Sequence, residues 1–310
     1  MQRLTRDRIS YVFDRRLEPV LRVASGEPFL VETEDSRTGR TRTPETTTPD
    51  FLRAMRAQGY HGNPVTGPIY VEGAEPGDTL AVHIQDMKCN TLGYLGYWPF
   101  LYHLDDWITD PVTELVEIRD GRVCYTFRAR TGAQNLRIPV RPMIGTIGTA
   151  PALEAIASGG MGRFGGNLDV PEICPGSTVY LPVAVPGALL FLGDCHAYQG
   201  DGEVSGIEMR SEVALSATVL KGWTKNMTWL RVETPTHLVS VACDRPLESA
   251  QWLAIREMIL WLEERYDWSK AEARLFLNLV SELRPGQVQV GLYSMRLLVA
   301  KEHLLASPKR

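Results

Sequence analysis

Acidic, amide and imidazole side chains are concentrated at the two ends of one stretch, residues 165–206. Asn167 and Asp169 lie at its first end, after a pair of glycines. The second end carries a larger polar set: Asp194, His196, Gln199, Asp201 and Glu203. Carboxylate and imidazole ligands together suit zinc, whereas oxygen ligands alone suit calcium or magnesium. The stretch therefore predicts a metal or acid–base site.

The segment between the two polar ends is apolar and reads as two strands. Residues 178–185 are rich in β-branched and aromatic side chains, as strands are. Pro186-Gly187 is a turn signal, because proline fixes φ and glycine tolerates positive φ. Residues 188–192 then resume the strand pattern. We expect a hairpin that returns both polar ends to the same end of a sheet.

This arrangement assigns roles to the polar residues. We expect Asp169, His196 and Glu203 to hold a divalent metal ion, zinc rather than calcium. Glu203, Asp194 and Asn167 are the expected catalytic groups, with Glu203 as general base. The glycine-rich residues 143–166 are interpreted as a mobile loop over the site, whose backbone N–H groups hold an oxyanion.

A nucleophilic cysteine is the alternative mechanism. Cys195 lies between Asp194 and His196. Neighbouring side chains of a strand point to opposite faces, however, so Cys195 is expected to face away from the other two.

Several motifs resemble those of the acetamidase/formamidase family, and the likeness runs from about residue 17 to residue 287. The matching segments are residues 165–169 (GGNLD), 180–183 (YLPV), 187–189 (GAL), 193–203 (GDCHAYQGDGE), 63–78 (NPVTGPIYVEGAEPGD) and 138–142 (IPVRP), the last with Gly145, Gly148 and Ala150-Pro151. The resemblance implies hydrolysis of small amides to a carboxylate and ammonia. It also implies a mainly β fold, a divalent metal and self-association into a homo-oligomer.

The opening of the chain departs from the family pattern. Ser10 stands where the family usually has a histidine, and Phe13 stands where it has a tryptophan. If that histidine is a metal ligand in relatives, His61 and His103 are possible replacements here.

An aromatic segment, residues 94–107, also looks unlike the small-amide enzymes, which suggests a different or larger substrate. The residues expected to contact substrate are Gly166, Gln199, Trp98 and Tyr102. The alternative for the aromatic residues is that they fill a core or a subunit interface.

Composition narrows the class of protein. The chain has 310 residues and a net charge of −4, which gives no electrostatic reason to expect nucleic-acid or membrane binding. Five cysteines without a CxxC pair argue against a disulfide framework, so a cytoplasmic location is expected. The longest apolar run is broken by Pro182, Pro186 and Gly187, and it is too short to span a bilayer.

Short strands separated by turns predict a mainly β protein, with a β-sandwich or barrel body and a C-terminal α+β subdomain. We expect three parts, residues 1–150, 151–242 and 243–310. A helical apolar spacing covers residues 247–266, and a capping box at Ser269 and Glu272 opens a second helix to about Leu283. Residues 287–290 and 295–300 are expected to be strands.

The sequence thus favours a metal-dependent amidase that acts on a linear amide. One alternative is a specialised relative that acts on a larger aromatic or cyclic amide, or that catalyses a non-hydrolytic step. A second alternative is a non-catalytic β-sandwich binding protein, against which the clustered ionisable groups argue.

Overall fold

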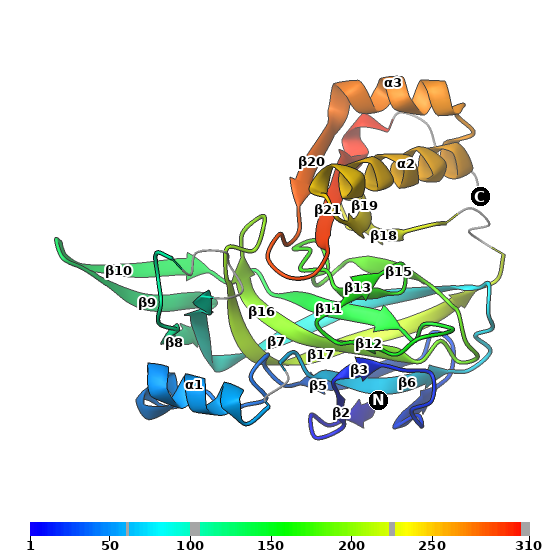
Figure 1. Cartoon of the computed structure of the whole chain (residues 1–310). Coiled ribbons are helices and arrows are strands. Elements are labelled where there is room, and N and C mark those ends of the chain that lie inside the picture. Colours follow the sequence, from blue (N-terminus) through cyan, green and yellow to red (C-terminus); the bar gives the residue numbers. More distant parts are fainter. Residues whose placement is uncertain (60–61, 100–105, 223–226, 305–310) are drawn as a thin grey trace.

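The computed structural model describes residues 1–59, 62–99, 106–222 and 227–304, and it confirms the mainly β class. Most strands join one curled sheet, and two C-terminal helices pack beside it (Figure 1). The strands before residue 100 are β1 (Gln2–Leu4), β2 (Ile9–Ser10), β3 (Val12–Phe13), β4 (Leu21–Val23), β5 (Pro28–Thr33), β6 (Val65–Val71) and β7 (Thr79–Tyr97). Between β5 and β6 lie a 3-10 turn, η1 (Pro44–Thr47), and a helix, α1 (Pro49–Ala57).

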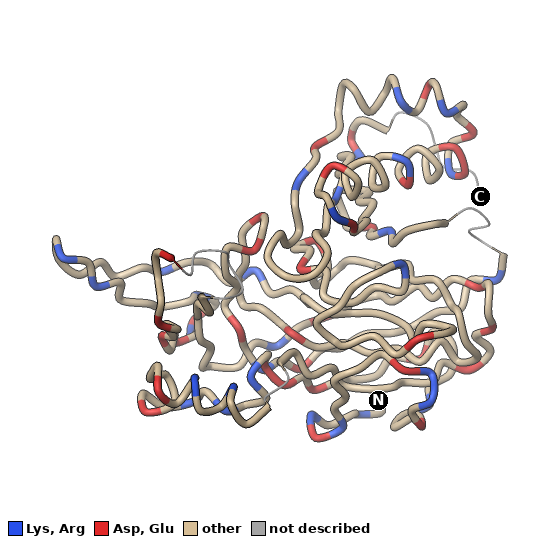
Figure 2. The backbone as a smooth tube through the Cα atoms, in the orientation of Figure 1, with Lys and Arg blue, Asp and Glu red and all other residues tan. Residues whose placement is uncertain are grey.

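The middle of the chain supplies the rest of the body. Its strands are β8 (Val112–Arg119), β9 (Arg122–Ala129), β10 (Gly132–Pro139), β11 (Met143–Thr149), β12 (Ile156–Ala157), β13 (Met161–Gly162), β14 (Gly165–Asn167), β15 (Thr178–Pro182), β16 (Leu190–Gln199) and β17 (Gly206–Leu220). The β9–β10 hairpin projects as an arm, with basic residues at its far end (Figures 1 and 2). Long β17 pairs with both β5 and β7, and its alternate residues Val213, Leu215 and Ala217 are buried.

The expected hairpin between residues 178 and 192 is wrong. β15 pairs with β7 and β18, whereas β16 pairs with β11, β6 and β17. The Pro186-Gly187 turn is present, but the chain passes through it from one part of the sheet to another. A local pattern of strand, turn and strand does not fix which strands pair, because register depends on distant partners.

The expected mobile loop at residues 143–166 is wrong where strands form, above all at residues 143–149. β11 is buried at every position and pairs with β14 and β16. Its small residues permit close approach, because a Cβ added at Gly148 would lie 2.8 Å from the Phe164 carbonyl oxygen and 3.0 Å from the Gly166 nitrogen. Gly148, Gly165 and Gly166 serve tight strand packing, whereas a Cβ added at Gly159 would meet nothing within 4 Å.

The C-terminal part is built as expected, with two corrections. It comprises β18 (Leu230–Glu233), β19 (His237–Asp244), α2 (Leu247–Tyr266), α3 (Lys270–Val280), β20 (Ser281–Pro285), β21 (Tyr293–Ala300) and a final 3-10 turn, η3 (Lys301–His303). The Ser269 capping box is present. However, α3 ends at Val280 and β20 follows, because Ser281–Pro285 pairs with β21. Residues 287–290 do not form a strand; Gln287 makes only an isolated bridge to Gly202.

The three-part division at residues 150 and 242 stays a prediction. Strands of the first two parts pair with each other, as β5 and β7 do with β17 and β6 does with β16. Among the residues described, no helix combines the length and apolar character needed to cross a membrane.

Candidate functional site

Strand β11 brings the two polar ends together. On one side it pairs with β14, where Thr146 lies opposite Asn167. On the other side it pairs with β16, where Met143 lies opposite His196 and Thr146 lies opposite Gly193. The residues expected to form the site therefore meet across β11, and not across a hairpin.

Two overlapping groups of potential ligands result. Asp169, His196 and Glu203 form one, and Asp194, His196 and Glu208 form the other; in each group the ligand atoms lie within 4.8 Å of one another. Three of these acids hold left-handed backbone conformations, with φ of 50° at Asp169, 53° at Asp194 and 48° at Glu203. Such conformations are costly for residues other than glycine and are held by their surroundings, as often happens at functional sites.

His196 is held in one orientation and one tautomer. The Gln199 side chain donates from Nε2 to the Asp169 carbonyl oxygen at 2.8 Å, which leaves its Oε1 to accept from His196 Nδ1 at 2.7 Å. Since Nδ1 carries a proton, Nε2 is the ring nitrogen that offers a lone pair when the ring is neutral. That atom lies 3.5 Å from Asp194 Oδ1 and 3.4 Å from Glu208 Oε1. A histidine that donates its other ring nitrogen in this way is typical of metal ligands.

Amide and hydroxyl groups hold the outer oxygens of the two aspartates. Asn167 Nδ2 donates to Asp169 Oδ2 at 2.9 Å. Thr146 Oγ1 and Asn63 Nδ2 both contact Asp194 Oδ2, at 3.2 and 3.1 Å. Both also donate to Asn167 Oδ1, at 2.6 Å each. The inner oxygen of each aspartate therefore points away from this network.

Four buried polar atoms at this point have no hydrogen-bond partner within the described part of the chain. They are Asp169 Oδ1, Asp194 Oδ1, His196 Nε2 and Glu208 Oε2. Buried polar atoms are normally paired, and orphaned acceptors that converge call for a donor or a cation. All four can donate a lone pair, so the residues present fit a divalent metal ion.

The close packing of several carboxylates at this site shifts the pKa values of its side chains. Burial and the Asp194 carboxylate raise the pKa of Asp169 to about 7. Burial and Asp169 raise the pKa of Glu203 well above its ordinary value, and burial and Asp194 raise that of Glu208. Burial disfavours the charged form of His196, but Glu208 and Asp194 outweigh it and raise its pKa. The cluster thus holds more negative charge than its histidine can neutralise.

Two glycines make room for the cluster. A Cβ added at Gly145 would collide with Asp169 Oδ1 and would lie 2.7 Å from the Asp194 carbonyl oxygen. A Cβ added at Gly206 would lie 2.6 Å from His196 Nδ1. Neither position tolerates a side chain without displacing a potential ligand.

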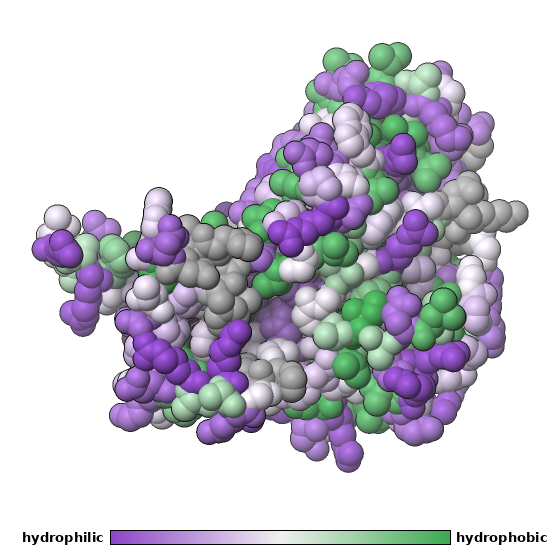
Figure 3. Space-filling model, viewed as in Figure 1, coloured by the Kyte–Doolittle hydropathy of each residue, from purple (hydrophilic) through white to green (hydrophobic). Residues whose placement is uncertain are grey.

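The cluster lies at the floor of a cavity of about 550 Å³. Asn167, Asp194, Glu203 and Glu208 line its acidic side. The same cavity is also lined by Ser36, Arg37, Arg56, Tyr94 and Trp98. The face drawn in Figure 3 is hollowed at its centre, with hydrophilic surface at the bottom.

The other residues singled out from the sequence are placed as follows. Trp98 lines the cavity, whereas Trp107 is 80% exposed. Gly166 lies in β14 opposite Ile147 and Met161, and its contact with substrate stays a prediction. Tyr102, His61 and His103 lie outside the described residues. Ser10 bonds locally, since Val12 N donates to its Oγ at 3.1 Å.

Cys195 faces away from the acids. Thr33 Oγ1 donates to its Sγ at 3.4 Å, and burial raises the pKa of the thiol to about 12. A buried, protonated thiol on the opposite face is a poor nucleophile.

Sequence reasoning missed Glu208, Asn63 and Thr146. Glu208 lies directly opposite His196 in the β16–β17 pair, but the register shifts between His196 and Gln199, so counting back from the turn at residues 200–205 would have placed Met209 there instead. Asn63 lies within the family-like segment 63–78, but the sequence alone assigned it no role. Thr146 was assigned to the supposed loop.

The chain is similar to known proteins along most of its length. The model of a family described as Acetamidase/Formamidase family matches residues 7–161 and 159–256. An acetamidase structure from Bacillus halodurans is 35% identical, with a TM-score of 0.87, and the match covers 97% of this chain and 98% of that one. The structure of a predicted acetamidase/formamidase from Thermoanaerobacter tengcongensis is 31% identical, with a TM-score of 0.86 and coverage of 98% and 96%.

Curated relatives match over a shorter share. The acetamidase of Mycolicibacterium smegmatis is 29% identical over 221 residues, which is 51% of this chain and 53% of that protein. The chain spans about half the length of the curated relatives it matches.

Proposed function

Because this chain belongs to the acetamidase/formamidase family, we propose that it is an amidase that hydrolyses a linear amide C–N bond to a carboxylate and ammonia or an amine. The observation that carries this proposal is the convergence of four orphaned ligand atoms at the floor of the cavity. A protein that only binds its ligand has no need of such a cluster.

Asp169, Asp194, His196 and Glu208 would hold a divalent ion through the atoms left without partners. We favour zinc over calcium, because calcium prefers oxygen ligands and His196 offers a nitrogen. When bound, the ion supplies Lewis acidity, which polarises an amide carbonyl or makes a water molecule a better nucleophile at neutral pH.

The side chains provide the remaining chemistry. Glu203 lines the cavity beside Asp169, and it is the general base that takes a proton from water. It then returns the proton to the nitrogen of the leaving amine. Asp194 and Asn167 also face the cavity, where their network with Asn63 and Thr146 fixes the acids. Gln199 acts through His196, because both ends of its amide are already bonded within the protein.

Ammonia release tests the proposal directly. Formamide, acetamide and benzamide are offered to the zinc-loaded protein, before and after treatment with a chelator. We expect release from at least one amide, lost after chelation and restored by zinc. A folded, zinc-loaded protein that releases no ammonia from any amide would overturn the amidase assignment. Release that survives complete metal removal would overturn the metal assignment alone.

A Glu203→Gln variant separates the base from the ligands. The amide cannot accept a proton, so kcat should fall at least roughly 10²-fold, as when a general base is lost. Metal content should stay near that of the unaltered protein, because the other four side chains keep their atoms. Both quantities are measured on the same preparation, by ammonia assay and elemental analysis. Metal loss in this variant would instead make Glu203 a ligand, as its place in the Asp169 group permits.

Self-association is part of the same proposal. We propose that the chain forms a homo-oligomer, and light scattering on the eluted protein measures its mass.

A further inference from the structure

The cavity contains a buried arginine that pairs with no carboxylate among the described residues. Arg37, in the segment after β5, is 4% exposed and lines the same cavity as Glu203 and Glu208. Other buried arginines are paired: Arg231 Nε lies 2.6 Å from Glu257 Oε1, and Arg296 Nε lies 2.7 Å from Glu172 Oε2. Within residues 1–59, 62–99, 106–222 and 227–304, Arg37 takes part in no ion pair.

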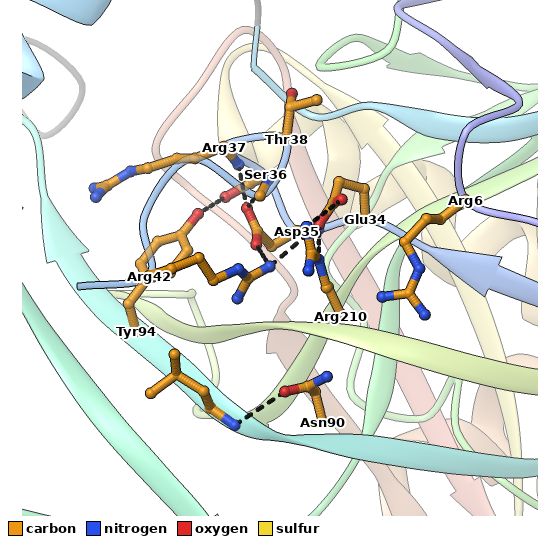
Figure 4. A network of polar contacts seen from close by, with 12 residues as sticks. Arg6, Glu34, Asp35, Ser36, Arg37, Thr38, Arg42, Asn90, Tyr94 and Arg210 are labelled. Carbon is orange, nitrogen blue, oxygen red and sulfur yellow. Dashed lines mark hydrogen bonds and ion pairs between the residues drawn. The ribbon is translucent and has the colours of Figure 1, made fainter. Parts of the chain in front are cut away.

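The segment that carries Arg37 is rigidly held. Asp35 Oδ1 accepts from the backbone N–H groups of Arg37 and Gly39, at 2.9 and 3.1 Å. The Asp35 carboxylate in turn pairs with Arg42, and Glu34 pairs with Arg210 (Figure 4). The neighbouring acids are thus committed to other arginines, and Arg37 is left to point away from them, as Figure 4 shows.

The guanidinium of Arg37 is also fixed at its tip. Its Nη1 donates to Thr113 Oγ1 at 2.8 Å and contacts Thr41 Oγ1 at 3.4 Å. It lies over the rings of Tyr94 and Trp98, 4.5 and 5.3 Å from the centroids. Its Nε and Nη2 have no hydrogen-bond partner in the part of the chain that the structure describes.

A buried, unpaired guanidinium is unfavourable unless an anion joins it. Its planar fork matches the two oxygens of a carboxylate. The rings of Tyr94 and Trp98 support the guanidinium at the wall of the cavity. The cavity, at about 550 Å³, is also far larger than acetamide, which occupies on the order of 100 Å³ if its four heavy atoms are scaled from water.

We propose that the substrate is an amide that also carries a carboxylate group, which Arg37 binds. This proposal rests on the amidase function proposed above. It places the scissile amide at the acidic cluster and the carboxylate at Arg37, both of which line one cavity.

Benzamide and 3-carboxybenzamide form a matched pair of probes, since they differ by the carboxylate alone. The unaltered, zinc-loaded protein should show a kcat/KM at least about 10-fold higher for 3-carboxybenzamide, as expected for a charge-assisted hydrogen bond. Arg37→Gln should reduce that preference roughly 10- to 100-fold. Arg37→Lys keeps the charge but loses the fork, so it should retain part of the preference.

Arg53→Gln is the charge-matched control. Arg53 lies on α1 near Arg56, but it pairs with Asp50 at 2.9 Å and with Asp110. Its loss removes one positive charge without removing the proposed contact, so the preference should change less than about twofold. Equal kcat/KM for the two probes in the unaltered protein would overturn the inference, even if the Arg37 variants failed to fold. An equal fall in kcat/KM for both probes in Arg37→Gln would also overturn the inference.

Calorimetry separates this inference from the amidase proposal, because binding needs no turnover. The two probes are titrated into zinc-loaded Glu203→Gln protein with and without Arg37→Gln. Tighter binding of 3-carboxybenzamide that depends on Arg37 supports the carboxylate contact. Such binding without hydrolysis of any amide by the unaltered protein overturns the amidase proposal alone. Hydrolysis with no Arg37-dependent difference in binding overturns the carboxylate contact alone.

Discussion

Replacing His196 by glutamine is expected to remove both the bound metal and the turnover. His196 Nε2 is the nitrogen ligand that faces Asp194 Oδ1 and Glu208 Oε1, and it has no partner of its own. Glutamine can still bond to Gln199 but offers no comparable lone pair. We expect kcat/KM to fall at least roughly 10³-fold, which is the scale of lost metal and electrostatic catalysis. Elemental analysis and ammonia release on one preparation measure both effects.

Two further variants show whether the loss is specific. His83→Gln makes the same change at an exposed strand residue, whose Nδ1 contacts Thr178 Oγ1 at 3.2 Å, and it should alter neither quantity. Gln199→Leu removes the group that orients His196, so metal affinity should fall by roughly 10- to 100-fold and not be abolished. Full metal content in His196→Gln, with unchanged turnover, would refute the proposed centre.

Local structure was predictable where the determining residues are close in sequence. The apolar spacing at residues 247–266 predicted α2 with its observed bounds, Leu247–Tyr266. The capping box at Ser269 is satisfied on both sides, as its two residues required. A helix is specified by contacts within one or two turns, so its pattern is visible in a short window.

Strand pairing was not predictable in the same way. β11 was mistaken for a loop because Gly145 and Gly148 weaken strand propensity. Glycine is required at these positions by residues distant in sequence: a Cβ at Gly145 would contact Asp169 and Asp194, and one at Gly148 would contact Phe164. Such requirements belong to the folded sheet and leave no periodic signal in the segment itself.

The site residues also divide into those visible in a short stretch of sequence and those that depend on distant strands. Asp169, His196 and Glu203 could be singled out because they cluster in sequence among glycines. Glu208 and Arg37 lie in segments whose alternation suggests only solvated strand and loop residues. Their roles follow from their neighbours in the folded protein: Glu208 lies opposite His196, and Arg37 lines the cavity. Residue type and spacing located the centre of the site, whereas its outer parts required the pairing of β11, β16 and β17.

Replacing Glu257 by alanine is expected to destabilise the C-terminal part more than any surface substitution. Glu257 lies on the buried face of α2, where it and Arg231 of β18 are both fully buried. Its Oε1 accepts from Arg231 Nε at 2.6 Å. Its Oε2 accepts from the backbone nitrogens of Thr228 and Trp229, each at 3.0 Å, and from the Thr228 hydroxyl at 2.7 Å.

Alanine at position 257 would leave two backbone donors and most of a guanidinium buried without an acceptor. Glu264 still pairs with Arg231 Nη1 at 2.6 Å, but it does not reach the donors of Thr228 and Trp229. Removal of one partner of a buried ion pair costs about 3–5 kcal/mol, so urea unfolding should shift by that free energy. Glu263→Ala is the matched control on the same helix: its partner Lys270 is 3.5 Å away and largely exposed, so the change should stay below about 0.5 kcal/mol. Equal effects at the two positions would mean that α2 is anchored by its apolar face and not by the Glu257–Arg231 pair.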